Sequence, residues 1–295
     1  MPKQRWVIDD IVCADSRYLS SFVKPNSIAL TITSPPYRNA INYKKHVKNS
    51  NEYYRGEPLW SSVEDYLNDM KKIFDEVYKV TIPGGYCAIV IGYEVINAEI
   101  IPLPSLLLVK LLEDNKWKLR EEIIWNKVTA GRRGAGNRFS VTVKNPYPTY
   151  YHANVMHEYI FVLSKGEVKP SVRRKRAKKK LVMNEIMKRE ISNSIWNITP
   201  VPPGMINHPC PFPEQIPWRL INLYSLSEDD IILDPFNGSG QTTKVAKNLK
   251  RHYIGVDIIP QYVELAKKRL TEPLHLSNLE YVKEWGQEKI RYLQE

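Results

Sequence analysis

Long apolar runs and paired cysteines are both missing from this 295-residue sequence. No apolar stretch approaches the ~20 residues that a helix needs to span a bilayer, so no membrane segment is predicted. The three scattered cysteines, Cys13, Cys87 and Cys210, provide neither a disulfide framework nor the spacing of a zinc site. Residues 1–6 lack the apolar region of a signal peptide. We therefore expect a cytoplasmic protein without a bound metal.

Acidic residues are the scarcer charge, with 32 Asp and Glu against 43 Lys and Arg and a formal net charge of +11. Such an excess favours a polyanion as the partner. Residues 126–157 contain no acidic residue, and Lys169–Lys180 carries eight basic residues in twelve. Basic side chains can bind phosphates, and aromatic rings near them can stack on bases, so this composition suits contact with a nucleic acid. An ordinary surface loop and a solvated linker would have the same composition.

The apolar pattern predicts an α/β fold in one domain over residues 1–295, since a hydrophobic fraction of 43% supports a large core. The helix that begins at Ser62 keeps one apolar face and is predicted to end at Pro83-Gly84-Gly85. The alternation of elements predicts a mostly parallel sheet with helices on its faces. The predicted strands are 7–15, 27–32, 86–91, 122–125, 159–163, 231–234 and 253–257, and the other predicted helices are 16–22, 105–113, 216–226 and 242–249.

The first informative motif is Thr33-Ser34-Pro35-Pro36-Tyr37, directly after the apolar run 27–32. Two prolines end the strand because neither has an N–H to donate. Ser34 and Tyr37 are then expected at the carboxyl end of a strand, where α/β sheets bind ligands. A hydroxyl and rigid proline carbonyls can accept hydrogens from a planar NH₂ group while the tyrosine ring stacks on its face. A Pro-Pro turn beside a buried tyrosine is the structural alternative.

The second motif is a strand that ends in Asp234, a turn containing Gly238 and Gly240, a helix, and a strand that ends in Asp257. This βαβ unit is typical of a nucleoside pocket, because glycines let the backbone approach the ligand and the terminal acid can bind ribose hydroxyls. The third glycine of a dinucleotide fingerprint and the Gly-Lys-Ser/Thr of a phosphate loop are missing. The pocket suits a nucleoside without a pyrophosphate, such as S-adenosylmethionine.

Together these motifs resemble the β-class of DNA amino-methyltransferases, in which the target-base motif precedes the cofactor motif. Ser34-Pro35-Pro36-Tyr37 is similar to the family's catalytic motif, and residues 236–240 are similar to its cofactor loop. Residues 208–214 resemble the segment that helps to enclose the methionine end of the cofactor. Residues 124–127 and the pair His157-Glu158 also have counterparts in the family.

This resemblance implies a Rossmann-like methyltransferase fold with circularly permuted motif order and basic target-recognition insertions at 128–156 and 164–195. It implies methyl transfer from S-adenosylmethionine to the exocyclic amino group of a base flipped out of double-stranded DNA. The serine at position 34, where adenine enzymes of the family typically carry aspartate, favours N4 of cytosine. N6 of adenine stays open as the target. A restriction–modification role follows from the same resemblance, while both a monomer and a homodimer stay open.

The resemblance also implies roles for individual residues. Ser34 and the Pro35 carbonyl would accept the amino hydrogens, and Tyr37 would stack on the base beside Pro36. Asp15 would reach the adenine of the cofactor, or would be a plain surface acid. The other expected cofactor-binding residues are Asp234, Phe236, Asn237, Gly238, Ser239, Gly240, Thr242, Asp257, His208 and Phe212.

Four other readings compete with this one. Cys210 follows a proline, as the nucleophile of C5-cytosine methyltransferases does, but it precedes the glycine motif and is followed by Pro211. His157-Glu158 lacks the i, i+4 spacing of a helical zinc site. A nucleic-acid-binding protein with an inactive pocket, or an enzyme acting on RNA or protein, would share much of the composition.

Overall fold

The computed structural model describes residues 6–38, 60–96, 99–127, 146–167, 177, 181 and 187–276. Residues 39–59, whose mix of aromatic and basic residues predicts a surface loop, lie outside these ranges, as do most of the predicted insertions 128–156 and 164–195. The second insertion begins inside β7 (His157–Lys165), and its last residue, Ile195, is the first of β8 (Ile195–Asn197).

An eight-stranded sheet forms the centre of the described structure, in the order β1-β10-β9-β2-β3-β7-β6-β8. The pairings are parallel except for the two that β7 makes, with β3 and with β6. The mostly parallel, Rossmann-like sheet predicted from the sequence is therefore confirmed. Besides β7 and β8, its strands are β1 (Asp10–Cys13), β2 (Ile28–Thr33), β3 (Thr81–Ile91), β6 (Trp117–Asn126), β9 (Ile231–Asp234) and β10 (His252–Asp257).

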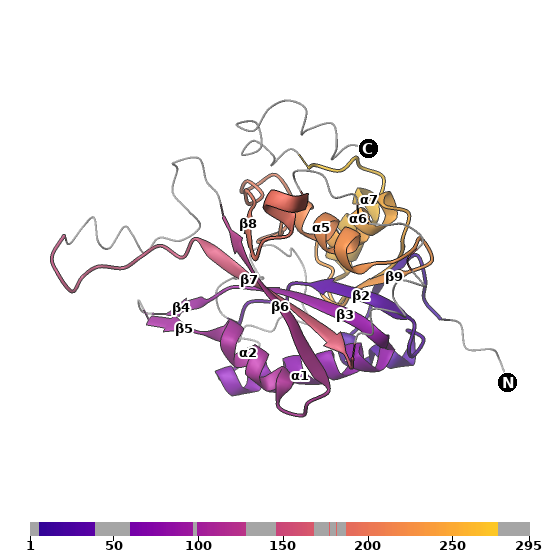
Figure 1. The fold of residues 1–295 in the computed structure, drawn as a ribbon, viewed down its shortest axis with the longest axis horizontal. Coiled ribbons are helices and arrows are strands. Elements are labelled where there is room, and N and C mark those ends of the chain that lie inside the picture. Colours follow the sequence, from indigo (N-terminus) through magenta and orange to yellow (C-terminus); the bar gives the residue numbers. More distant parts are fainter. Residues whose placement is uncertain are drawn as a thin grey trace.

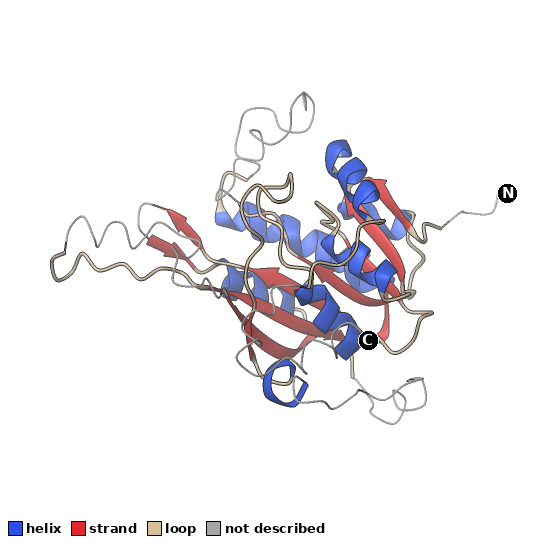
Figure 2. Ribbon diagram, turned by 90° about the horizontal axis from the view of Figure 1, so that it is seen from above, coloured by secondary structure: helices blue, strands red, loops and turns tan. Residues whose placement is uncertain are grey.

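Helices cover both faces of this sheet (Figures 1 and 2). On one face lie α1 (Val63–Val80), α2 (Leu103–Leu112) and the 3₁₀ helix η1 (Ser16–Ser21). On the other lie α5 (Gln215–Tyr224), α6 (Gln241–Asn248) and α7 (Pro260–Arg269). The sequence predicted these helices to within a few residues, except α7, which it missed.

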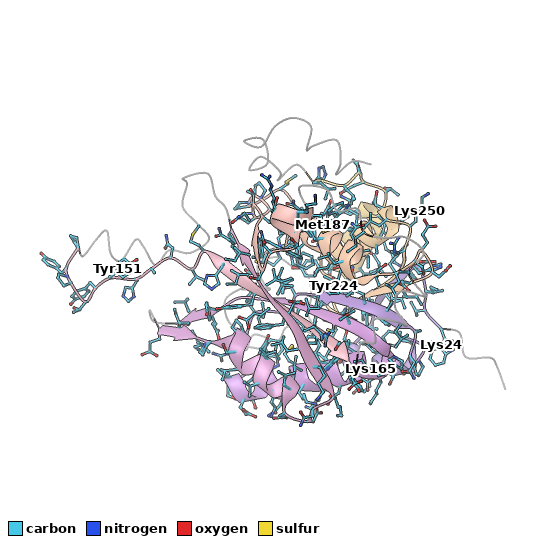
Figure 3. All side chains as sticks on the ribbon, in the orientation of Figure 1. Lys24, Tyr151, Lys165, Met187, Tyr224 and Lys250 are labelled. Carbon is cyan, nitrogen blue, oxygen red and sulfur yellow. The ribbon has the colours of Figure 1, made fainter. Side chains whose placement is uncertain are left out.

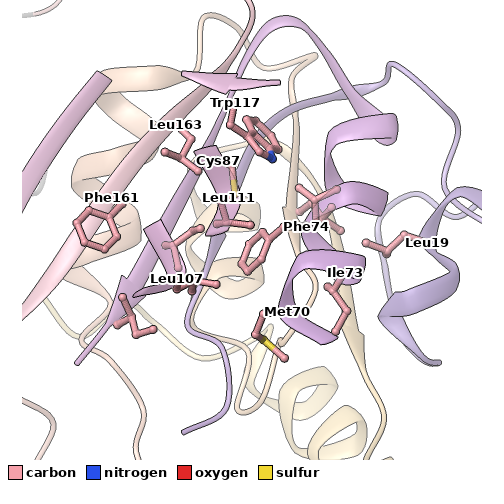
Figure 4. Packing of buried hydrophobic residues seen from close by; sticks show 14 of the residues in the cluster. Leu19, Met70, Ile73, Phe74, Cys87, Leu107, Leu111, Trp117, Phe161 and Leu163 are labelled. Carbon is pink, nitrogen blue, oxygen red and sulfur yellow. The ribbon is translucent and has the colours of Figure 1, made fainter. Parts of the chain in front are cut away.

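Each face has its own apolar core, because neighbouring side chains of a strand point to opposite sides. In β3, Cys87 and Ile89 belong to the first core, whereas Ala88 and Val90 belong to the second. Figure 4 shows the first core, where Phe74 of α1 lies among Cys87, Leu107 and Leu111. No helix in the described part of the chain is long and apolar enough to cross a bilayer.

The predicted end of α1 is wrong. The helix begins as expected, with the Ser62 hydroxyl accepting from the N–H of Asp65, but it ends at Val80, and β3 follows at once. Residues 82–85, with the Pro-Gly-Gly turn, lie inside β3, opposite a register shift in β2. Proline without an N–H and Gly84 at φ +75° produce a bulge in the strand rather than a helix stop.

Other differences concern short or half-exposed elements. The first strand is shorter than 7–15. Strand β6 is longer than 122–125, and its first half was missed because most of it is exposed and carries no apolar run. Strand β8, the hairpin of β4 (Glu94–Ile96) and β5 (Glu99–Ile101), and the π-helical turn η3 (Met187–Ile191) were not predicted.

The position of β2 matters most for the site. It pairs in parallel with β9 on one side and β3 on the other, so the residues after β2 and β9 meet at one edge of the sheet. At that edge the Thr33 hydroxyl donates to Asp234 Oδ1 at 2.6 Å. The Thr242 hydroxyl of α6 donates to the carbonyl of Ile32 at 3.1 Å. Side-chain hydrogen bonds thus fasten β2 to the β9–α6 unit.

We predict that Thr33→Val lowers the free energy of unfolding by about 1–3 kcal/mol, because the buried Asp234 carboxyl loses a partner. Thr31→Val is the matched control: both threonines are fully buried in β2, but the Thr31 hydroxyl has no hydrogen-bond partner among the described residues. Its replacement should be neutral or stabilising. Urea unfolding of the three proteins measures both effects, and equal losses in the two variants would contradict the prediction.

Candidate active site

A cavity of about 330 Å³ opens at the carboxyl ends of β1, β2, β9 and β10. Residues from both sequence motifs form its wall, since the strands before them are neighbours. The predicted site residues that line it are Asp15, Ser34, Pro35, Pro36, Tyr37, His208, Phe212, Phe236, Asn237, Gly238, Ser239 and Asp257.

Three predicted cofactor residues lie behind this wall instead. Asp234 is 1% exposed, and burial raises the pKa of its carboxyl to about 7. Gly240 has φ +82°, and a Cβ there would lie 2.8 Å from Cβ of Ala266, so this glycine lets the loop approach α7. Thr242 is fully buried against β2. These three residues hold in place the loops that carry the cavity wall.

The turn after β9 is fixed between two other segments. Its residue Gly238 has φ +46°, and a Cβ there would lie 2.7 Å from His208 Nε2. The N–H of Gly238 donates to Asp257 Oδ2 at 2.8 Å, and that of Asn237 donates to the Val256 carbonyl at 2.9 Å. Backbone therefore lies exposed to the cavity at Gly238, with an imidazole on one side and a carboxylate on the other.

Among the residues that the structure describes, Asp257 is one of three acidic residues on the cavity wall, with Asp15 and Asp69. Its two oxygens accept from the N–H groups of Gly238 and Ile259, at 2.8 and 2.9 Å. Burial nevertheless raises the pKa of this carboxyl to about 6, against the hydrogen bonds that lower it. The group is ionised at pH 8, and a carboxylate has lone pairs for further donors besides these two.

Asp15, which follows β1 at the same edge of the sheet as Asp257, is engaged by its neighbour. The Arg17 guanidinium donates to both carboxylate oxygens, with Nη2 at 2.6 Å from Oδ2, and the Arg17 N–H donates to Oδ1 at 2.9 Å. Burial acts to raise the pKa of Asp15, but these hydrogen bonds lower it below its ordinary value. Asp15 is thus an ionised acceptor of fixed orientation.

Part of the wall had no signal in the sequence. Asp69, Met70 and Ile73 of α1 line the cavity, although the pattern of α1 indicated only a core-facing helix. Asp69 accepts from the Trp60 indole N–H at 3.1 Å. Ile259 and Tyr262, by contrast, follow the acid that ends β10. Their position just after a predicted nucleoside-pocket acid could have been used to find them.

The competing nucleophile and metal readings find little support in the geometry. Cys210 lines the cavity, but desolvation, with a smaller effect of the Glu158 carboxylate, raises the pKa of its thiol to about 11. A thiol of that pKa supplies almost no thiolate at neutral pH. Glu158 accepts from Lys127, and His157 packs edge-on against Tyr159. Among the described residues no group of three or more His, Cys, Asp or Glu could hold a metal ion.

Fold and site together define a methyltransferase of the Rossmann-like class, and the comparison with known families is more specific. A family model of DNA methylases that transfer to N6 or N4 amino groups matches residues 28–268. The chain belongs to this family of S-adenosylmethionine-dependent DNA amino-methyltransferases.

Curated relatives and solved structures are similar over most of the chain. The type II β methyltransferase M.BslI of Bacillus sp. (strain NEB-606) is 26% identical over 88% of this chain, which spans only 27% of M.BslI. The type II methyltransferase M.ScaI of Streptomyces caespitosus is 28% identical, with 87% of this chain and 79% of M.ScaI covered. TTHA0409 of Thermus thermophilus superposes with a TM-score of 0.63 at 25% identity, covering 88% of this chain and 93% of that one.

The residues of the cavity fit the cofactor of this family. An ionised acid at the end of β10 suits ribose hydroxyls, and the aromatic rings of Phe236 and Tyr262 suit a nucleoside. At Gly238 the missing side chain leaves room for the His208 ring, so the imidazole packs directly against this loop at the cavity wall. Bound there, S-adenosylmethionine supplies an activated methyl group.

We predict that the affinity for S-adenosylmethionine is constant at pH 7–8 and falls about tenfold per pH unit below pH 6, as Asp257 gains a proton and loses an acceptor. Asp257→Asn should bind weakly with little pH dependence. Isothermal titration between pH 5 and 8 measures this. Because Asp234 titrates in both proteins, an equal decline in the two would assign the dependence to Asp234 and contradict the prediction.

Proposed function

We propose that this enzyme methylates N4 of cytosine in double-stranded DNA. The observation that carries the proposal is Ser34 on the wall of the cavity, at the end of the strand that pairs with β9. A serine hydroxyl and the adjacent Pro35 carbonyl can accept the two hydrogens of an exocyclic NH₂ group. The Tyr37 side chain, on the same wall, can stack on the face of the base.

In this proposal the protein acts by placement. Holding the amino group by its hydrogens orients the nitrogen lone pair toward the methyl donor, and residues 236–239 and Asp257 would hold the donor in the same cavity. No covalent bond to the enzyme is needed, which agrees with the high pKa of Cys210. An amino group inside a duplex cannot enter a cavity of this kind, so the base must be flipped out.

N6 of adenine is the alternative target, since the family includes enzymes of both specificities. Serine at position 34 supports cytosine because adenine enzymes that this chain resembles typically carry aspartate there. The type II relatives further support a role in restriction–modification.

We propose that the segments 128–156 and 164–195 contact the DNA. Tyr147, Tyr150 and Tyr151 are 68%, 53% and 68% exposed. Figure 3 shows Tyr151 on an arm that extends away from the sheet. Rings in such a position can stack on bases, and the sequence around them carries no acidic residue.

We expect Tyr151→Ala to weaken duplex binding by roughly 1–3 kcal/mol, the usual loss when a base-stacking ring is removed. Affinity for S-adenosylmethionine should not change. Tyr18→Ala is the control, since Tyr18 is 63% exposed on η1. Fluorescence anisotropy with a labelled duplex measures the effect. Equal binding by both variants would mean that the arm is an ordinary surface loop without a role in DNA binding.

Ser34→Ala should reduce methyl transfer by at least about a hundredfold, the usual cost of removing one preorganised polar partner. Cofactor affinity should be kept, because the residues proposed to hold the cofactor are 236–239 and Asp257 and not Ser34. The experiment incubates protein, labelled cofactor and genomic DNA, and identifies the methylated nucleoside by mass spectrometry. N4-methylcytosine is expected from the parent and from the control Thr31→Val. Normal turnover by Ser34→Ala, or N6-methyladenine as the product, would contradict the proposal.

A further inference from the structure

A buried ionic cluster backs the cofactor side of the cavity wall. Arg269, the last residue of α7, is 4% exposed, and Lys244 of α6 is fully buried. Both cations contact Glu214 Oε1, Arg269 Nη2 at 2.9 Å and Lys244 Nζ at 2.8 Å. Glu272 Oε2 lies 3.2 Å from Arg269 Nε. Two cations thus face two anions. Glu214 is paired with Lys244 as well as with Arg269, so it keeps a cationic partner when Arg269 is replaced.

Arg269 does more than pair with acids, because it also reaches the cofactor loop. Its Nη1 donates to the carbonyl of Ser239 at 2.6 Å and to Gln241 Oε1 at 2.7 Å. The other end of the 239–240 peptide is also held, since the N–H of Gly240 donates to the Asn237 carbonyl at 2.7 Å. A peptide unit is rigid, so these bonds fix the plane of the 239–240 peptide.

Gln241 extends this connection to the opposite side of the cofactor pocket. Its side-chain NH₂ donates to the carbonyl of Phe212 at 2.6 Å. Ser239, Gln241 and Phe212 all line the cavity, whereas Arg269 lies behind them. One guanidinium therefore ties together two stretches of wall that are more than twenty residues apart in the chain.

We propose that Arg269 is a positioning residue for S-adenosylmethionine, which holds the Ser239–Gln241 turn and the Phe212 segment at the spacing that the ligand requires. The inference depends on the cofactor lying against the 236–240 loop. The fork geometry of arginine is essential here, because one side chain must serve a carbonyl, an amide and two carboxylates at once. A lysine, with a single nitrogen, can keep the charge but not this set of bonds.

The test compares Arg269→Met and Arg269→Lys with Arg219→Met. Arg219 of α5 is a matched control, since it is 1% exposed but pairs with Glu190 and stacks on Trp196 instead of bonding to the 239–241 turn. Equilibrium dialysis with labelled S-adenosylmethionine, without DNA, gives the dissociation constant. Steady-state assays give KM for the cofactor and kcat, and thermal unfolding gives Tm.

We expect Arg269→Met to raise the dissociation constant and KM for the cofactor at least about tenfold, with kcat at saturating cofactor within about threefold of the parent. The dissociation constant and KM of Arg269→Lys should lie between those of the parent and those of Arg269→Met. Arg219→Met should lower Tm without changing cofactor affinity. Should Arg269→Met not fold, the lysine variant carries the same comparison, because it keeps a cation beside Glu214 and Glu272.

The proposal is overturned if the foldable Arg269 variants bind the cofactor within about twofold of the parent, a margin far below the losses that misplacement causes. It is also overturned if Arg219→Met weakens binding equally, since the effect would then follow from general destabilisation. Gly238→Ala tests separately the assumption that the cofactor lies against the 236–240 loop. Unchanged cofactor binding in that variant would mean that the ligand does not contact this loop.

Discussion

The parallel pairing of β2 with β9 is the constraint on which the site depends. Parallel strands end at the same edge of a sheet, so Ser34 and the turn at Gly238 become neighbours although about two hundred residues separate them. The hydrogen bond from Thr33 to Asp234 fastens the two ends just before the chain leaves the sheet. Motif order along the chain is irrelevant to this arrangement, because strand pairing decides which ends meet. A permuted sequence therefore reaches the same architecture.

Two buried acids stand at this edge and carry an energetic cost. Burial raises the pKa of Asp234 to about 7 and that of Asp257 to about 6, above the 3.8 of an exposed aspartate. The folded state holds these protons more tightly than the unfolded chain does, so their contribution to stability is greatest below about pH 4 and declines as the pH rises to about 7. Hydrogen bonds from Thr33 and from the Gly238 and Ile259 backbone limit that cost. At neutral pH the site thus keeps an ionised acid on its wall at the expense of some stability.

The sequence was most informative where local chemistry is restrictive. Consecutive prolines must end a strand, and turns that need positive φ favour glycine, so the motifs around Ser34 and Gly238 could be placed at strand ends. The same reasoning failed for Pro83-Gly84-Gly85, because a bulge inside a strand uses the same residue types as a helix stop. Of the expected cofactor-binding residues, Asp234, Gly240 and Thr242 lie behind the cavity wall.

Contacts made by tertiary packing could not be predicted. Asp69 reaches the cavity from a helix whose pattern indicates only burial, and Arg269 reaches the Ser239 carbonyl from the end of a helix that the sequence analysis missed. In both cases a polar side chain is buried among partners that are distant in the chain. Periodicity records which face of a helix is covered, but not by what.

The most direct test of the central claim is a crystal structure of the protein with S-adenosylhomocysteine and a short duplex that contains its target sequence. We predict one extruded cytosine in the cavity, its amino nitrogen within hydrogen-bond distance of the Ser34 hydroxyl and the Pro35 carbonyl, and the cofactor product against Gly238 and Asp257 on the facing wall. A base and a cofactor product bound in separate cavities, with the Ser34 wall touching neither, would contradict the account.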